Sequence, residues 1–411
     1  GYFLFSGLPA GNCSLAISKN GYTTYTTTVA VPANSTITVG GSSELKLYPS
    51  ASGSVEIVSN ISGGEIIIDG EETGVVMSDT TYTLNNLSPG NHSFSLKKNG
   101  FKEVASKNIN IENGGTASVE LILYGSNNKI YFVSERNSDF DNEEFVLELF
   151  SMNPDGTDQK KVGDIHAGYV AASVDGSFLL YSPSSSASDE DKLCSIFKIN
   201  SDGTNKQCIL ATSTMLTTGV TLSYDGNTVG FLNFDQECSE TNNYFNCSEL
   251  YTMQTNGLNL KRITNNTYSD YMLAFSPNGN KMVFGSSRKS LSDPDIYIIN
   301  SNGTNEIQLT NDDKSRSPSF SPIGAKILFQ SWRSGNTDIY TMNADGTDPV
   351  NISNSLDLAE ENPYYSPDGT KIIFTVFIDM YYEYDVFIMD ADGGNKTRLT
   401  YSRGNDYGVS W

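Results

Sequence analysis

Short apolar stretches separated by glycine turns fill residues 125–411, and their spacing repeats six times. In each repeat a glycine stands six residues after an aromatic residue and six residues before an aliphatic one. The six glycines are Gly156, Gly203, Gly257, Gly303, Gly346 and Gly393, and 43 to 54 residues separate neighbours. Short strands that recur with a period in this range are typical of the blades of a β-propeller.

A second glycine turn lies between the turns of the first set. It occupies residues 173–176, 223–226, 276–279, 321–324 and 366–369, and the fifth residue after each is Tyr181, Phe231, Phe284, Phe329 or Phe374. Glycine permits the positive φ of a tight hairpin, and Asp or Asn side chains bond to the turn backbone. We expect each aromatic side chain to pack against the neighbouring blade, because a blade cannot cover its own faces.

The first repeat lacks the first of its four expected strands. It begins at residues 129–132, which match the second strand of the last repeat at residues 371–374. Residues 407–411, after the sixth repeat, have the pattern of a first strand. We therefore expect the C-terminal strand to complete the first blade, because an open ring would expose two blade faces and unpaired strand edges.

These repeats resemble the TolB-like propeller, which combines a Ser-Pro-Asp-Gly turn with an Asp-Ile-Tyr-x-Met-x-x-Asp-Gly hairpin. Residues 275–279 with 295–303, and 365–369 with 385–393, are close to that pattern. Blades one to three depart from it, with Val174 and Tyr224 where proline is usual. The resemblance implies the fold and says little about function, because propellers host many unrelated activities.

Residues 53–123 form a different unit of alternating strands. The Ile-x-Ile-Asp-Gly turn at 66–70, the Leu-x-Pro-Gly-Asn segment at 87–91 and the Asn-Gly-Phe segment at 99–101 resemble the PEGA domain, a small β-sandwich of archaeal and bacterial surface proteins. Residues 8–12 and 19–22 repeat the second half of this unit, and nothing in the sequence matches its first two strands.

We therefore predict an all-β chain of three domains. They are a partial PEGA-like β-sandwich at residues 1–49, a complete one at residues 50–124, and a six-bladed TolB-like propeller with C-terminal strand closure at residues 125–411. A half-sandwich exposes strand edges and an apolar face. Either the sequence omits residues of the intact protein, as its start at Gly1 without a methionine suggests, or a neighbouring subunit supplies the missing strands by β-strand addition.

Charge excludes one class of partner, and apolar run length excludes another. With 26 Lys and Arg against 48 Asp and Glu, the net charge is −22. A phosphate-binding surface must be basic, so we expect no nucleic-acid partner. No apolar run reaches the roughly 18 residues that span a bilayer, so we expect no membrane insertion of this segment.

Ten sequons favour the cell exterior. Candidate N-glycosylation sites are Asn12, Asn34, Asn60, Asn86, Asn91, Asn246, Asn265, Asn302, Asn351 and Asn395. Five cysteines are too few for a disulfide scaffold, but Cys238 and Cys247 lie nine residues apart in one loop and form our candidate disulfide. Cys194 and Cys208 lie on two strands of one hairpin without being directly opposite, so we favour this pairing less.

The sequence contains few candidate catalytic or metal-binding residues. The two histidines, His92 and His166, lie in separate domains, so we expect no zinc cluster, and a Ser-His-Asp triad would have to use His166. Peptidases with this propeller carry a following hydrolase domain with a G-x-S-x-G turn, which the sequence lacks, so we predict no enzyme. We expect no cofactor. The acidic turns at residues 343–346 and 390–393 could bind calcium, but a hairpin needs the same residues to form its turn.

The loops between the second and third strands of the blades are long, and alternation places them on one rim of the ring. Long loops on a rigid scaffold are where binding usually resides. The candidate binding rim consists of Asp139, Phe140, Asp141, Glu143, Glu144, Asp189, Glu190, Asp191, Tyr244, Trp332, Tyr381 and Tyr382.

Two functions without catalysis follow. The first is an extracellular structural protein that self-associates head to tail into a filament, sheath or surface layer through strand addition at the N-terminal module. The second is a surface binding module whose acidic, aromatic rim recognises a protein or a glycan.

Overall fold

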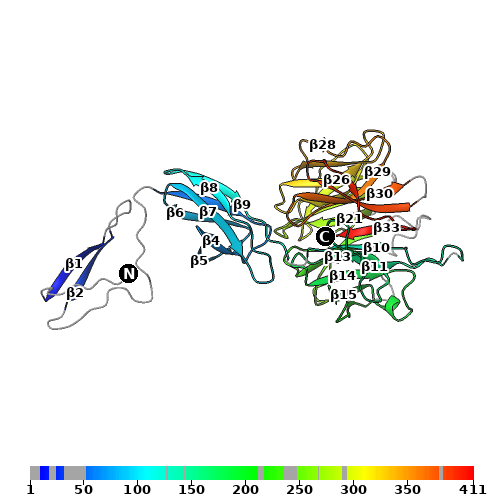
Figure 1. The fold of residues 1–411 in the computed structure, drawn as a ribbon, viewed down its shortest axis with the longest axis horizontal. Coiled ribbons are helices and arrows are strands. Elements are labelled where there is room, and N and C mark those ends of the chain that lie inside the picture. The colour runs from blue at the N-terminus through cyan, green and yellow to red at the C-terminus, as the bar shows by residue number, and fades with distance from the viewer. Residues whose placement is uncertain are drawn as a thin grey trace.

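The computed structural model describes residues 10–17, 25–31, 52–125, 128–142, 144–211, 217–234, 248–266, 268–288, 294–378 and 383–411. Within these ranges the protein is all-β, apart from one turn of 3-10 helix at Asp191–Leu193. Figure 1 shows a small sandwich beside a larger ring of strands. The predicted fold class is confirmed, with one partial and one complete sandwich before a six-bladed propeller.

The first unit is a two-stranded antiparallel sheet. Strand β1 (Gly11–Ile17) pairs with β2 (Tyr25–Val31) along its whole length, and no other described strand joins them.

The second unit is a complete sandwich of two sheets. One sheet has the order β6-β3-β9 and the other β5-β4-β7-β8. Their bounds are β3 (Gly53–Val58), β4 (Glu65–Ile68), β5 (Glu71–Val76), β6 (Thr81–Leu87), β7 (Gly90–Lys97), β8 (Lys107–Ile111) and β9 (Thr116–Glu120). Its core includes the fully buried side chains of Val55, Ile57, Ile66, Phe94 and Leu96.

The ring consists of six four-stranded antiparallel sheets, the blades, and the first strand given for each blade is the one nearest to the axis. Blade one is β33 (Asp406–Ser410), β10 (Ile130–Ser134), β11 (Glu148–Met152) and β12 (Lys160–Lys161). Blade two is β13 (Ala167–Ala172), β14 (Phe178–Pro183), β15 (Ile196–Asn200) and β16 (Gln207–Leu210). Blade three is β17 (Thr217–Leu222), β18 (Thr228–Phe234), β19 (Ser248–Gln254) and β20 (Lys261–Arg262).

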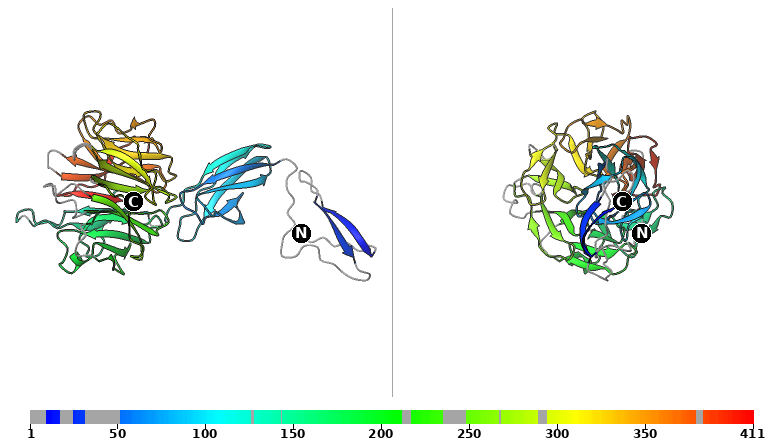
Figure 2. Two further views of the ribbon diagram at one scale, coloured as in Figure 1. Left: turned by 180° about the vertical axis from the view of Figure 1, so that it is seen from behind. Right: turned by 90° about the vertical axis from the view of Figure 1, so that its left-hand side faces the viewer.

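The other three blades repeat this arrangement. Blade four is β21 (Ser269–Phe275), β22 (Lys281–Ser287), β23 (Asp295–Asn300) and β24 (Ile307–Gln308). Blade five is β25 (Ser315–Phe320), β26 (Lys326–Ser331), β27 (Asp338–Asn343) and β28 (Val350–Asn351). Blade six is β29 (Ala359–Tyr365), β30 (Lys371–Ile378), β31 (Glu383–Asp390) and β32 (Thr397–Arg398). The view along the molecule in Figure 2 shows the strands of the propeller arranged in a ring around one axis.

The repeated aromatic residues pair across the second and third strands of each blade. The pairs are Phe132–Phe150, Tyr181–Phe197, Phe231–Tyr251, Phe284–Tyr297, Phe329–Tyr340 and Phe374–Phe387, with ring centroids 5.1 to 5.9 Å apart. Each pair also belongs to a hydrophobic cluster that spans two neighbouring blades. Phe374, for example, packs with Leu328 and Ile339 of blade five, which confirms the expected packing between blades.

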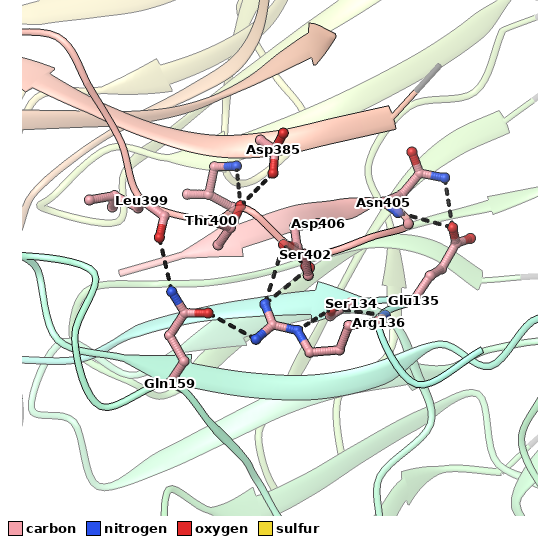
Figure 3. Close-up of polar contacts among 12 residues, drawn as sticks. Ser134, Glu135, Arg136, Gln159, Asp385, Leu399, Thr400, Ser402, Asn405 and Asp406 are labelled. Carbon is pink, nitrogen blue, oxygen red and sulfur yellow. Dashed lines mark hydrogen bonds and ion pairs between the residues drawn. The ribbon is translucent and has the colours of Figure 1, made fainter. Parts of the chain in front are cut away.

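The C-terminal strand closes the ring as predicted, because β33 pairs with β10 of the first blade. Polar contacts join the two ends of the propeller beside this pairing (Figure 3). The Arg136 guanidinium donates to both carboxylate oxygens of Asp406, at 3.3 and 3.2 Å. Asn405 donates its side-chain amide to Glu135 at 2.7 Å, and the Gln159 amide donates to the Leu399 carbonyl at 2.9 Å.

The sandwich lies against the face of the ring where the turns between first and second strands gather. The Gly125 N–H donates to the Val174 carbonyl at 2.8 Å. A Cβ atom on Gly125 would lie 2.3 Å from the carbonyl carbon of Asp175, so only glycine fits this junction. Ile122 approaches the turn of blade six at Gly369. The long loops of the blades are therefore on the opposite, uncovered face.

Closure of the ring by β33 predicts a stability difference between two valines. Val409 on β33 is buried in the cluster shared by blades six and one, whereas Val350 on β28 is 53% exposed. We expect Val409→Ala to lower the free energy of unfolding by about 2 kcal/mol, through lost burial and a cavity. The matched control Val350→Ala is expected to change it by less than about 0.5 kcal/mol.

Urea unfolding followed by tryptophan fluorescence measures this difference, because Trp332 and Trp411, the two tryptophans of the sequence, both lie in the propeller. Equal effects of the two substitutions would show that β33 is not part of the cooperative ring.

Candidate binding site at the mouth of the propeller channel

A cavity of about 620 Å³ lies on the axis of the ring. Its walls come from five of the six innermost strands, β13, β17, β21, β29 and β33, and from the long connections of blades one and two at Glu135, Leu147 and residues 184–185. Because these strands start on the face with the long loops, the cavity is the loop-side mouth of the central channel.

Every blade carries a β-bulge at its innermost strand. The ladder register shifts between Ala167 and Tyr169, Thr218 and Thr221, Tyr271 and Ala274, Arg316 and Ser319, Glu361 and Tyr364, and opposite β10 in blade one. The bulged residues with positive φ are Gly219, Met272, Ser317, Asn362 and Gly408. Bulges leave backbone groups out of the ladder and re-aim side chains, and they are common at the rims of barrels and next to functional sites.

Three of these residues carry side chains in a backbone region that disfavours them. Met272, Ser317 and Asn362 have φ values of 49°, 53° and 52°. Left-handed backbone of this kind costs about 1–3 kcal/mol per residue and persists where the surroundings enforce it. Met272 and Asn362 line the cavity itself. The backbone that lines the mouth is therefore locally strained at Met272 and Asn362.

Four tyrosines and two acids give the mouth its chemistry. Tyr169, Tyr364, Tyr384 and Tyr407 line the cavity together with Glu135 and Glu361. Burial raises the pKa of Tyr407 to about 12, so its hydroxyl stays protonated. Burial also raises the pKa of Glu361, although the Arg316 guanidinium lies 3.5 Å away and opposes the shift. A concave site that combines aromatic side chains with a small number of polar groups is typical of binding pockets.

Comparison with known proteins identifies the domains. The family model described as the TolB beta propeller domain matches residues 177–406, which is more than half of the chain. The chain belongs to the TolB β-propeller family. The model of the PEGA domain matches residues 52–126, so a PEGA domain precedes the TolB propeller. No curated protein sequence matches the chain.

Solved structures agree with this fold. A TolB structure from Acinetobacter baumannii is 19% identical, with 79% of each chain covered and a TM-score of 0.56. The structure of a TolB homologue from Agrobacterium tumefaciens is 20% identical, covers 66% of this chain and 88% of its own, and gives a TM-score of 0.50.

The predicted rim acids of blades one and two lie beside the mouth of the TolB propeller. Asp139 and Glu144 exchange backbone hydrogen bonds of 2.9 Å, which close a small hairpin carrying Phe140 and Asp141. Phe140 packs edge-on against Phe145, which is 55% exposed. The flanking residues Glu135 and Leu147 line the cavity, so the loop and the mouth form one surface.

The blade-two loop joins the same surface. The Leu147 N–H donates to the Ser186 hydroxyl at 3.1 Å, which ties the two loops together. Asp191 forms an ion pair of 2.5 Å with Lys206, while the neighbouring Asp189 and Glu190 are exposed.

Of the other predicted rim residues, the structure describes Trp332, which does not line the cavity. Trp332 lies on blade five, where the Arg316 guanidinium is 5.8 Å from its ring. Glu143, Tyr244, Tyr381 and Tyr382 lie outside the described residues. Sequence reasoning missed the channel tyrosines Tyr169, Tyr364 and Tyr407, because it looked for binding residues in loops and these lie on strands.

The disulfide in the described part of the chain is the one we favoured less. Cys194 and Cys208 are bonded, with their Cα atoms 5.9 Å apart. The register shift between Ile196 and Phe197 and the turn of helix at Asp191–Leu193 bring the two residues together although they are not paired in the ladder. The predicted partners Cys238 and Cys247 lie outside the described residues.

The sequons differ in their access to solvent. Asn12, Asn86, Asn91, Asn265, Asn302 and Asn395 are exposed, and Asn34 and Asn246 lie outside the described residues. Asn60 is fully buried and its amide donates to the Leu123 carbonyl at 2.7 Å, so it offers no accessible nitrogen. The half-buried Asn351 donates its amide to Asp338 at 2.8 Å.

The histidine nearest to a triad is not the one expected from the sequence. His166 Nδ1 lies 3.5 Å from the Ser186 hydroxyl and its Nε2 3.9 Å from Asp164. His92 lies closer to its partners, with Nδ1 2.7 Å from Asp69 and Nε2 3.1 Å from the Ser88 hydroxyl. However, Nε2 lies only 2.8 Å from the Ser88 carbonyl oxygen, which can only accept. Nε2 therefore donates there, and the contacts fix a turn instead of activating the serine.

The acidic clusters are already occupied by protein groups. Glu148, Asp164 and His166 could together hold a metal ion. The Lys161 ammonium lies between them, 2.5 Å from Glu148 and 2.8 Å from Asp164. At the acidic turns, the carboxylate of Asp345 accepts hydrogen bonds from the backbone and hydroxyl of Thr347 at 3.0 and 2.6 Å. These oxygens serve the hairpins, and a calcium site there stays a hypothesis.

The disulfide predicts a measurable contribution to stability. Replacing both Cys194 and Cys208 by serine is expected to lower the free energy of unfolding by about 3 kcal/mol, because the bridge closes a loop with a sequence separation of 14. Urea unfolding of the TolB propeller measures the change, and dithiothreitol treatment of the unmodified chain is expected to reproduce it. An unmodified, non-reduced chain in which both thiols react with a thiol reagent would contradict the assignment.

Proposed function

We propose that the chain is a non-enzymatic binding protein of the cell surface that holds a segment of a partner protein in the mouth of its propeller channel. The observation that carries this proposal is the cavity of about 620 Å³ on the axis, which is continuous with the loops of blades one and two. The loop face is also the face that the PEGA domain leaves uncovered.

The chemistry of the mouth favours a segment of a partner protein. Tyrosine side chains provide large rigid contact areas and are enriched among the residues that dominate protein interfaces. Glu135 and Glu361 in the mouth, with Asp139 and Asp141 on the adjoining loop, favour a segment that carries Lys or Arg. A glycan that stacks on the tyrosines is the alternative ligand.

The cell surface is the compartment that fits the domains best. TolB-like and PEGA domains are typical of periplasmic or surface proteins. The disulfide between Cys194 and Cys208 favours an oxidising environment. No helix among the described residues has the length and apolar character to cross a bilayer.

The lining of the mouth supports binding without catalysis. Among the described residues, those that line the cavity include no histidine, cysteine or lysine that could act as the base for a nucleophile.

A second candidate function is assembly into a polymer. In the PEGA domain, β7 pairs with both β4 and β8, whereas the equivalent strand β1 pairs only with β2 among the described strands. This difference favours addition of a strand from a second copy along the edge of β1. Contacts of this kind, made head to tail, build filaments when they do not close.

Peptide selection tests the binding function. Phage-displayed random peptides selected on the whole chain are expected to be enriched in Lys and Arg. The double variant Tyr169→Ala, Tyr364→Ala is expected to bind the selected peptides at least about tenfold more weakly, since truncating interface aromatics commonly costs more than about 1 kcal/mol. Fluorescence anisotropy with labelled peptides measures the affinities.

The matched control is Tyr268→Ala, Tyr401→Ala, which removes two exposed tyrosines that do not line the cavity. It is expected to bind the peptides as the unmodified chain does. Peptides without basic residues, or a mouth variant with unchanged affinity, would overturn the proposal. Selection of glycans instead of peptides from an array would support the alternative ligand.

Electron microscopy tests the assembly function. Native material is expected to contain polymers, and deletion of residues 1–48 is expected to leave monomers, because the acceptor strand is then absent. Polymers formed by the deletion variant would show that assembly uses another surface.

A further inference from the structure

Pairs of buried acids lie at the seams between blades. At three seams, an acid at the start of the third strand of one blade accompanies an acid at the start of the first strand of the next blade. The pairs are Glu249 with Asp270, Asp338 with Glu360, and Asp385 with Asp406, and all six side chains are at most 2% exposed. Burying two like charges together is unfavourable unless cations or donors compensate both.

At two of these seams, cations or several neutral donors contact both acids. Between blades six and one, Arg398 pairs with Asp385 at 2.5 Å. At the same seam, Arg136 pairs with Asp406 at 3.2 Å (Figure 3). Between blades five and six, Lys396 pairs with one carboxylate oxygen of Glu360 at 2.8 Å, and the other oxygen has no hydrogen-bond partner among the described residues. The Asp338 carboxylate at that seam accepts hydrogen bonds from Ser334, Asn351 and Ser355.

The seam between blades three and four is less compensated. Arg262 lies 3.1 Å from one carboxylate oxygen of Glu249, and the other oxygen has no hydrogen-bond partner among the described residues. The donors to Asp270 are neutral: the Ser286 hydroxyl at 2.6 Å, the Asn266 amide at 3.3 Å and the Thr264 hydroxyl. The Arg288 guanidinium favours the charged form of Asp270, but it also pairs with Glu306 at 2.7 Å.

We propose that this seam holds a proton on Asp270, and that the propeller loses stability when the proton leaves as the pH rises through neutrality. The inference goes beyond the proposed binding function and does not depend on any ligand. The geometry that carries it is the fully buried acid pair in which Arg262 pairs with Glu249, whereas the hydrogen-bond donors to Asp270 are neutral. A proton is the smallest cation that removes the repulsion.

The expected pKa values agree with this geometry. Burial raises the pKa of Asp270 to about 7, and the charge of Glu249 adds to the shift, whereas Ser286, Thr264 and Arg288 oppose it. At the seam between blades six and one, burial raises the pKa of Asp385 to about 6. The Arg398 charge opposes this shift, and the Asp406 charge adds to it. Both carboxyl groups therefore bind a proton in the folded chain at a pH where the unfolded chain has released it.

The sign of the pH dependence follows from proton linkage. A carboxyl group whose pKa is raised by folding stabilises the folded state below that pKa, and this contribution disappears as the pH rises through it. The window extends from the ordinary value of 3.8 to about 7 for Asp270. For this group alone, the unfolding equilibrium constant is expected to increase on the order of tenfold between about pH 5.5 and 7.5.

Urea unfolding of the whole chain at a series of pH values, followed by tryptophan fluorescence, tests the proposal. Asp270→Asn mimics the protonated acid, so the variant is expected to lose most of the pH dependence in this window. Glu249→Gln removes the repelling charge and is expected to move the midpoint of the dependence to lower pH. The exposed Asp189→Asn is the matched control and is expected to unfold as the unmodified chain does.

The double variant His92→Gln, His166→Gln removes both histidines, the other side chains that ordinarily titrate near neutrality. It is expected to keep the dependence. An unmodified chain whose stability is constant or increases between about pH 5.5 and 7.5 overturns the proposal, even where the Asp270 variant fails to fold. An Asp270→Asn variant that retains the full dependence overturns it as well.

Discussion

The structure depends on the fact that a propeller blade has two apolar faces and cannot bury either one alone. Each hydrophobic cluster of the ring contains residues of two neighbouring blades, so every blade is stabilised by the blades on both sides. Such a series has no stable end, and the chain removes the ends by returning β33 to β10. The contacts of Arg136 with Asp406 then join residues that are 270 positions apart in the sequence.

A closed ring makes one face suitable for binding. The innermost strands are fixed from both sides, which allows them to keep bulges and left-handed residues such as Met272 and Asn362 around the axis. The turns between first and second strands contact the PEGA domain, so the long loops and the cavity are on the face that remains uncovered. Binding residues commonly lie on long loops that a rigid scaffold positions, and both features occur on this face.

Much of the fold could be predicted from local sequence, because its signals are local. A glycine with an aromatic residue six positions before it defines a hairpin, and six hairpins define six blades. The missing first strand of blade one and the extra strand at residues 407–411 predicted the closure. The candidate site could be predicted only in part, because Tyr169, Tyr364 and Tyr407 meet across the axis through ring geometry that no local pattern records.

The same limit explains the other differences. In a regular ladder Cys194 and Cys208 would not lie opposite each other. A bulge between Ile196 and Phe197, for which the sequence has no recognisable pattern, brings them together. Glu249 and Asp270 belong to different blades, so neither motif reveals that the two acids share a seam.

The central claim is that the loop-side mouth of the channel is the working surface of the molecule. Cryo-electron microscopy of the protein on its native surface, at a resolution that separates side chains, tests it most directly. The account predicts density of an extended partner segment in the mouth, in contact with Tyr169 and Tyr407. An empty mouth, with partner density on the outermost strands of the blades, would contradict it.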